Sequence, residues 1–248
     1  EQAMLAAMSV SAMFERIAAT VNLQRLRRFT VELLPARCCL CGARSHTPGL
    51  DLCADCAAAL PWSQAGGWRA GQLSAVVAPL RYEFPVDQLV QALKYRGEGV
   101  YARVLGELLA RQVVAERAGG RLPELLVPVP LHRARYRERG FNQAAEIAKH
   151  VASHLQLSCA PRAVQRLLAT RSQTSLSPAE RRRNVRCAFA IAPGRAGAVL
   201  HGLRHVAIVD DVVTTGSTAD ELARLLRAAG IATVELWAAA RASGAGRA

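Results

Sequence analysis

Four cysteines in the first quarter of the chain have the spacing of a metal site. They form two Cys-x-x-Cys pairs, Cys38 with Cys41 and Cys53 with Cys56, separated by eleven residues. Such pairs predict four thiolates around one tetrahedral, structural Zn²⁺, with no position open for a substrate. Because few apolar residues lie between the pairs, the metal would have to hold this segment together. A disulfide pair or a thioredoxin-type redox motif remains the alternative, although a redox motif explains only one pair.

A second group of residues with chemistry follows an apolar run near the C-terminus. Asp210 and Asp211 come directly after the strand-like segment His205–Val209. The loop behind them carries hydroxyl groups and one glycine: Thr214, Thr215, Gly216, Ser217 and Thr218. Hydroxyls and free N–H groups at the start of the next helix favour a phosphate, and ionised carboxylates accept hydrogen bonds from sugar hydroxyls. The segment predicts a site for a ribose 5-phosphate unit; the alternative is an ordinary strand, polar turn and helix.

The elements that must position these residues alternate along the chain. The strand-like segments are Ala75–Tyr82, Leu125–Pro130, Cys187–Ile191, His205–Val209 and Thr233–Ala239. Helical spacing is found in 13–34, Val86–Tyr95, Val100–Arg117, Asn142–Gln156 and Ala219–Ala229. Thr218 and Glu221 have the spacing of a capping box at the start of the last helix. Short buried strands that alternate with helices predict an α/β domain with a mostly parallel sheet.

Composition and patterning also set the domain organisation. Apolar residues make up 51% of the chain, which excludes general disorder, and no stretch free of Asp, Glu, Lys and Arg exceeds 13 residues, which excludes a membrane span. The apolar stretch Gln2–Phe14 precedes the first basic residue, the reverse of a secretion signal, so we expect a cytoplasmic protein. The predicted parts are an N-terminal amphipathic helix (1–35), the zinc ribbon (36–60), a linker (61–74), the α/β domain (75–241) and a flexible tail (242–248).

Several blocks of the sequence resemble a known family. Val209–Thr218 is similar to the phosphoribosyl pyrophosphate (PRPP) motif of type I phosphoribosyltransferases. The blocks Leu93–Gly97, Val129–Gln143 and Arg171–Phe189 resemble the ComF/GntX family, as does a four-cysteine element ahead of the core. The resemblance covers about residues 33 to 241. It implies a type I phosphoribosyltransferase-like core with a mostly parallel sheet, preceded by a helix and a small zinc ribbon of four cysteines.

The resemblance also implies ligands and partners. PRPP with Mg²⁺ would be held by Asp210, Asp211 and the 214–218 loop. Members of the family are linked to the uptake and processing of single-stranded DNA during natural transformation, which implies single-stranded DNA and proteins of the DNA-uptake machinery as partners. The alternative is an active phosphoribosyltransferase that transfers the phosphoribosyl group of PRPP to an unidentified base or amine. Thr214 stands where hypoxanthine–guanine transferases carry an acid, so the loop supplies no general base and no catalytic residue is identified.

The positive charge of the chain is concentrated between residues 131 and 190. The whole chain has a formal net charge of +13, and this quarter of it holds twelve basic and three acidic residues. If residues 131–140 are extended, their four alternating arginines share one face. The candidate anion-binding residues are Arg133, Arg135, Arg137, Arg139, Arg181 and Arg183. A solvated basic face, the pyrophosphate arm of PRPP and a nucleic acid backbone remain open as explanations, with Tyr136 and Phe141 available to stack on bases.

Overall fold

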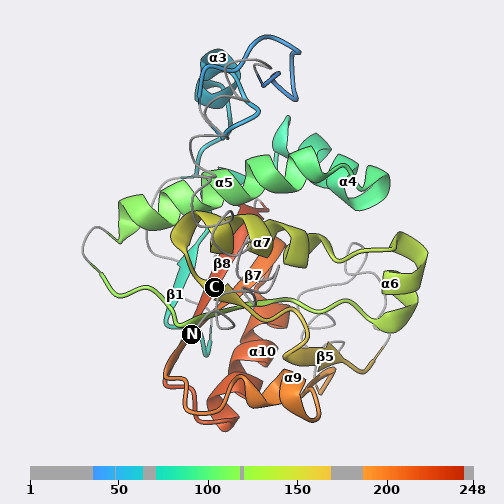
Figure 1. The fold of residues 1–248 in the computed structure, drawn as a ribbon, viewed down its shortest axis with the longest axis vertical. Helices are drawn as coiled ribbons and strands as arrows, with labels where there is room; N and C mark the ends of the chain where they lie inside the picture. The colour runs from blue at the N-terminus through green and yellow to red at the C-terminus, as the bar shows by residue number, and fades with distance from the viewer. Residues whose placement is uncertain (1–35, 48, 64–70, 118–119, 169–186, 243–248) are drawn as a thin grey trace, which may run out of the picture.

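The computed structural model describes residues 36–47, 49–63, 71–117, 120–168 and 187–242 of the chain (Figure 1). The helix expected over 13–34 lies outside these ranges. So do Arg181 and Arg183, two of the candidate anion-binding residues.

A parallel sheet forms the centre of the molecule and confirms the predicted α/β class. Its strands run in the order β1–β8–β7–β3–β4, β2 also pairs with β8, and every pairing is parallel. The strands are β1 (Ala75–Val77), β2 (Leu80–Arg81), β3 (Leu125–Pro128), β4 (Ser158–Cys159), β7 (His205–Val213) and β8 (Thr233–Arg241). β7 and β8 are nearly continuous apolar runs because both faces of a parallel sheet are covered.

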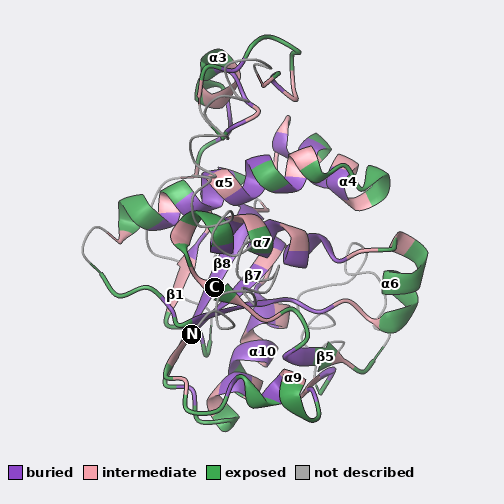
Figure 2. Ribbon diagram, in the orientation of Figure 1, coloured by how far each residue is buried: buried purple, intermediate pink, exposed green. Residues whose placement is uncertain are grey.

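Helices cover both faces of the sheet (Figures 1 and 2). One layer holds α4 (Val86–Arg96), α5 (Gly99–Glu116) and α7 (Gln143–Leu155); the other holds α9 (Arg195–Ala198), α10 (Ser217–Ala228) and the antiparallel pair β5 (Val164–Arg166) and β6 (Phe189–Ile191). Side chains of β7 alternate between these layers. Ala207 and Val209 join the core with α5 and α7, whereas Val206 and Ile208 join the core with α10.

A buried carboxylate ties the sheet to the first helical layer. Glu235 of β8 accepts a hydrogen bond from the indole N–H of Trp237 (2.9 Å), pairs with the His205 ring (2.8 Å) and forms an ion pair with Arg117. Trp237 is fully buried. Because its charge is matched by three neighbours, Glu235 is tolerated in the interior.

Two boundaries near the acid pair differ from the sequence prediction. β7 does not end at Val209 but continues through both acids to Val213, because β8 pairs with it along that whole length. The capping box is wrong: α10 begins at Ser217, with Gly216 before it and no side-chain cap. The Glu221 side chain instead accepts from the Cys187 N–H (2.8 Å) and from Arg224 (2.7 Å).

The cysteine-rich segment forms a small lobe beside the α4–α5 layer, with the short helix α3 (Ala54–Ala58) at its end (Figure 1). Leu50 and Leu52 of this lobe are buried in the same core as α5. Arg103 of α5 pairs with Asp51 at 2.5 Å. None of the helices that the structure describes is long and apolar enough to cross a membrane.

Candidate functional site

The four predicted cysteine ligands meet in space. The Sγ atoms of Cys38, Cys41, Cys53 and Cys56 all lie within 4.8 Å of one another, and those of Cys41 and Cys53 are 3.7 Å apart. Sulfurs bound to one tetrahedral Zn²⁺ at about 2.3 Å stand about 3.8 Å apart, whereas a disulfide needs about 2.05 Å. All seven cysteines are free. The distances fit a metal and do not fit the disulfide alternative.

Local backbone geometry aims the sulfurs at a common centre. Gly42 has φ +75° and donates its N–H to the Cys38 carbonyl (2.8 Å), which closes the first tight turn. Cys53 stands at the N-terminal cap of α3, where its sulfur accepts the N–H of Cys56 (3.5 Å). Each Cys-x-x-Cys pair is therefore shaped by the turn or helix start that contains it.

The thiols are also arranged chemically for a cation. Burial by itself raises the pKa of Cys38, but backbone N–H groups of Cys53, Cys41 and Leu40 outweigh it and bring that pKa to about 6. Hydrogen bonds to Cys53 and Cys41 raise the pKa of Cys56. A bound cation would replace these shared protons, so the donor set suits a structural Zn²⁺ that links the two pairs. Cys39 is outside the cluster, and burial raises its pKa to about 11.

The acid pair lies where β3 leaves the sheet. β3 pairs with β7 only as far as Val209, whose carbonyl accepts the N–H of Val129 (2.9 Å). β8 continues beside β7 through Val213. Asp210 and Asp211 are therefore inside β7 yet beyond the end of β3, at a step in the carboxyl edge of the sheet. Ligands of open α/β sheets bind at such an edge.

A lysine from α4 neutralises one of the two acids. The Lys94 Nζ lies 2.6 Å from Oδ2 of Asp211, whose side chain is only 8% exposed. Burial would raise the pKa of Asp211, but Lys94 outweighs it and lowers that pKa. Burial and the neighbouring Asp211 charge raise the pKa of Asp210 well above its usual range. The surroundings therefore favour the neutral form of Asp210 and the ionised form of Asp211.

An arginine that sequence reasoning missed approaches from the other side of the sheet. Burial lowers the pKa of Arg166 in β5, the Asp210 charge raises it and the Arg135 charge lowers it, so Arg166 lies within electrostatic reach of both. Its guanidinium stands 5.5 Å from the centre of the Phe189 ring. No sequence signal identified Arg166. Lys94 did leave one, because only two of the 32 basic residues are lysines and Lys94 lies in the block Leu93–Gly97.

The hydroxyl-rich loop turns directly from β7 into α10. Gly216 has φ +76°, which favours glycine, and its carbonyl accepts the Asp220 N–H (2.8 Å) inside the first turn. Thr215 Oγ1 and Ser217 Oγ are 2.7 Å apart, so these two hydroxyls bond to each other. The loop and the N-terminus of α10 follow the acids within a few residues, so the backbone N–H groups of the first turn lie close to them along the chain.

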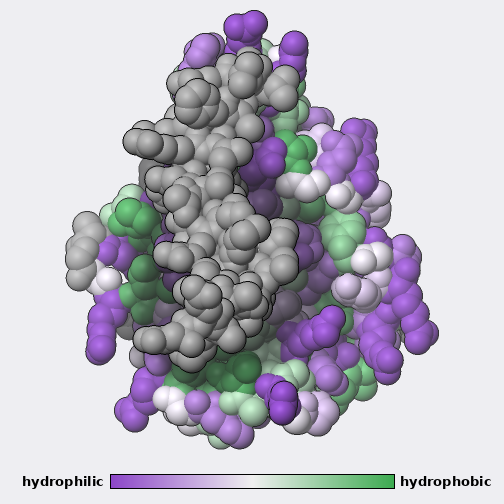
Figure 3. All heavy atoms as spheres, in the orientation of Figure 1, coloured by the Kyte–Doolittle hydropathy of each residue, from purple (hydrophilic) through white to green (hydrophobic). Residues whose placement is uncertain are grey.

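The four alternating arginines lie on a helix, so the expectation of one extended face is wrong. Residues Arg133–Arg139 form α6, and its exposed side chains make that end of the molecule hydrophilic (Figure 3). On a helix, Arg133 and Arg137 share one side and Arg135 and Arg139 share another. The positive charge of Arg135 lowers the pKa of Arg166. The Arg139 guanidinium donates a hydrogen bond to the side-chain oxygen of Gln143 (2.7 Å). Of these four arginines, Arg135 is the one whose charge acts on Arg166 beside the acid pair.

Two of the blocks that carry the family resemblance contact each other. Phe141 packs over Gly97 at the end of α4 and is partly buried in the core, so it is not a stacking surface. Asn142 donates to the carbonyl of Val129 (3.0 Å) and accepts the N–H of Ala144 (3.1 Å). The start of α7 is thereby fixed to the end of β3, beside the acid pair.

Comparison with known proteins gives relatives that match this chain over more than two thirds of their own length. No family model matches the chain. Competence protein F of Haemophilus influenzae is 36% identical over 163 residues, which are 65% of this chain and 70% of that protein. DNA utilization protein YhgH of Escherichia coli strain K12 is 38% identical, and that of Salmonella typhimurium 39%, each over 162 residues that make up 64% of this chain and 69% of the relative.

Proposed function

The chain belongs to the family of competence protein F and DNA utilization protein YhgH, and from that premise we propose that it acts in DNA utilization through two sites. The first is a pocket for PRPP with Mg²⁺ at the step in the sheet edge. The second is a surface for single-stranded DNA on α6. We further propose that the chain works beside proteins of the DNA-uptake machinery.

The observation that carries the pocket is the pair of neighbouring acids, of which Asp211 is buried and Asp210 is partly buried. Two neighbouring carboxylates in the interior cost free energy, and a strand end needs neither of them. Here Lys94 offsets the cost for Asp211, and the raised pKa of Asp210 favours its neutral form. Two vicinal hydroxyls of a ribose could donate to these oxygens, which is the recognition that a sugar ligand requires.

The groups around the acids match the rest of PRPP. The loop from Thr214 to Thr218 and the N-terminus of α10 suit the 5-phosphate. Lys94, Arg135 and Arg166 supply positive charge for the pyrophosphate. Carboxylate oxygens suit Mg²⁺, which would accompany PRPP and neutralise its charge.

The surface for DNA is supported by charge. The four arginines of α6 lie together on one short helix, more than a single PRPP molecule requires. Arginine forks bind phosphates, and a strand that follows them would bind without regard to sequence. Such binding weakens steeply as salt rises.

A melting experiment tests the pocket. Mg²⁺-PRPP should raise the melting temperature of the wild type, and it should do so less in Asp210→Asn and Asp211→Asn. Glu116→Gln on α5 removes one exposed acid elsewhere and should keep the full shift. No shift in the wild type, or a full shift in both aspartate variants, would contradict the pocket.

Catalytic transfer is a second candidate, favoured by the cations beside the acids. Lys94 and Arg166 could stabilise a leaving pyrophosphate while the pocket positions the ribose, and this form of catalysis requires no covalent chemistry from the protein. Thr214 cannot act as a general base, so the attacking amine or base must arrive deprotonated or lose its proton elsewhere. Pyrophosphate release across a panel of bases and amines tests this candidate.

A further inference from the structure

The outer side of α4 carries exposed groups that the proposed pocket does not use. Its inner side is buried through residues such as Leu89 and Leu93. On the opposite side Gln88, Gln91 and Tyr95 follow at spacings of three and four residues and are all exposed. Tyr95 is 80% exposed, and Phe84, just before the helix, is 72% exposed. These are the two most exposed aromatic side chains in the described part of the chain.

The exposed face of α4 is long enough for a short stretch of a nucleic acid strand. Gln88 and Tyr95 are seven residues apart on α4, which corresponds to about 10 Å along a helix. At about 3.4 Å per stacked nucleotide, this length holds about three nucleotides. On this face Gln88 and Gln91 precede Tyr95, and their amides offer both donors and acceptors to base edges.

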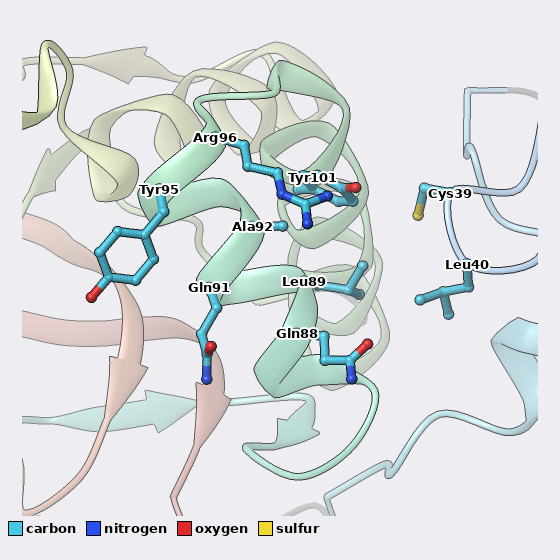
Figure 4. Close-up of a pocket in the computed structure, with 9 residues that line it drawn as sticks. All are labelled: Cys39, Leu40, Gln88, Leu89, Gln91, Ala92, Tyr95, Arg96 and Tyr101. Carbon is cyan, nitrogen blue, oxygen red and sulfur yellow. The ribbon is translucent and has the colours of Figure 1, made fainter.

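A hollow of about 520 Å³ lies beside this face, between α4 and the cysteine lobe (Figure 4). In Figure 4, Arg96 and Tyr101 lie on the side of α4 near Cys39 and Leu40, whereas Tyr95 extends away from the lobe. The hollow thus combines a guanidinium and a phenol with short apolar walls. A flat, polar-edged ring fits such a lining better than an acyl chain or an amphipathic helix does.

The distribution of charge around α4 indicates where the phosphates of a bound DNA strand would lie. The Arg139 guanidinium stands 5.9 Å from the centre of the Tyr95 ring, so the outer face of α4 continues into the arginines of α6. The acids near α4 stand at its ends: Asp87 accepts the N–H of Gln88 in the first turn, and Glu98 follows the last. The middle of the face carries no charge. Bases on α4 and phosphates on α6 is the arrangement that these charges favour.

We propose that the outer face of α4 binds the bases of single-stranded DNA, with Tyr95 as the main stacking residue and the hollow as a pocket for one splayed base. This inference rests on the proposed DNA surface and adds to it a site that contacts the bases of the strand, whereas α6 contacts its phosphates. Aromatic stacking tolerates every base, so the site gives affinity without strong sequence preference.

The test compares two probes of equal length, an oligothymidylate of twelve nucleotides and its fully abasic counterpart. The wild type should bind the thymidine strand more tightly, because the abasic strand offers phosphates alone. Tyr95→Ala should weaken thymidine binding about fivefold or more and leave abasic binding within about twofold. Tyr95→Phe should retain the difference between the probes. Val114→Ala, at an exposed position on α5, is the control and should change neither affinity.

The outcomes separate this inference from the DNA surface itself. Equal affinity of the wild type for both probes, or equal loss on both in Tyr95→Ala, overturns the base site while DNA binding stands. No binding of either probe overturns the DNA surface and with it the base site. The other possible occupant of this face is a second copy of the chain, which sedimentation of the free protein tests. If Tyr95→Ala dissociates a dimer and leaves thymidine binding intact, the face binds a second copy and the inference is wrong.

Discussion

Asp210 and Asp211 are adjacent residues whose side chains have opposite electrostatic environments. Lys94 stabilises the charge on Asp211 and lowers its pKa, whereas burial and Asp211 raise the pKa of Asp210. The pKa of an aspartate in the unfolded chain is about 4. Because the pKa of Asp210 is raised in the folded state, ionisation of Asp210 opposes folding once the pH exceeds about 4. A lowered pKa means that Asp211 stabilises the fold above the same pH.

The two single substitutions should therefore act in opposite directions without a ligand. Asp210→Asn removes the cost of ionisation and can still donate to Asp211, so the melting temperature should rise, and its advantage should grow as the pH rises from about 4. Asp211→Asn leaves Lys94 without its partner and should cost about 2 kcal/mol at pH 7. Denaturation from pH 4 to pH 8 measures both. Destabilisation by both variants at pH 7 would contradict these assignments.

Sequence reasoning singled out the acids, the loop and Arg135, but it did not single out Arg166. Asp210, Asp211 and the glycine at 216 are contiguous, so their pattern is visible in the chain. Arg166 reaches the acids only through the fold, since β5 lies across the sheet from α4, and no local pattern predicts that approach.

At the level of elements, single substitutions can distinguish the predicted zinc-binding cysteines of the metal lobe from Cys39. Cys53→Ser removes one of four predicted zinc ligands and should lower the zinc content and the melting temperature. Cys39→Ser is the matched control, because its sulfur lies outside the cluster, and this variant should keep one zinc per chain. Elemental analysis of the purified variants measures the content. Equal loss of zinc from both would show that Cys39 is a ligand.

The two sides of α6 should differ in function. Replacing Arg133 and Arg137 by alanine should weaken single-stranded DNA binding and reduce the slope of log affinity against log salt by about 1.4. Replacing Arg135 and Arg139 should do the same and also reduce the melting shift by Mg²⁺-PRPP, because the charge of Arg135 acts on Arg166. Salt titrations and melting curves on the two double variants test the difference. Identical effects in both assays would rule it out.

The predicted type of 133–139 and the predicted end of β7 were wrong because pairing with other strands decides both. The alternation of arginine with other residues in 133–139 suits a strand as well as a helix, and no sheet partner is offered there by the described residues, so a helical turn forms instead. The end of β7 depends on the length of β8, which the residues of β7 do not reveal. The longer helices α4, α5, α7 and α10 were predictable because their apolar periodicity is strong, whereas the short elements α3, α9, β4 and β5 were not predicted.

For the whole molecule, the α/β class followed from the alternation of strands and helices, and the structure confirms it. The net charge of +13 predicted an anionic partner but could not distinguish phosphates at a pocket from phosphates along a strand. The fold adds that distinction. Lys94 pairs with one of the acids, and the charge of Arg135 acts on Arg166 beside them. Arg133 and Arg137 lie on another side of the same helix.

The binding of PRPP itself tests the account most directly. Ribose hydroxyls can donate to both acids only when both are ionised, and the raised pKa of Asp210 favours its neutral form. Binding should therefore release a proton from Asp210 and weaken as the pH falls. Calorimetric titration with Mg²⁺-PRPP in two buffers of different ionisation heat counts that proton. The account predicts one ligand per chain, proton release in the wild type and none in Asp210→Asn. Absence of binding, or binding with the same proton count in wild type and Asp210→Asn, would contradict it.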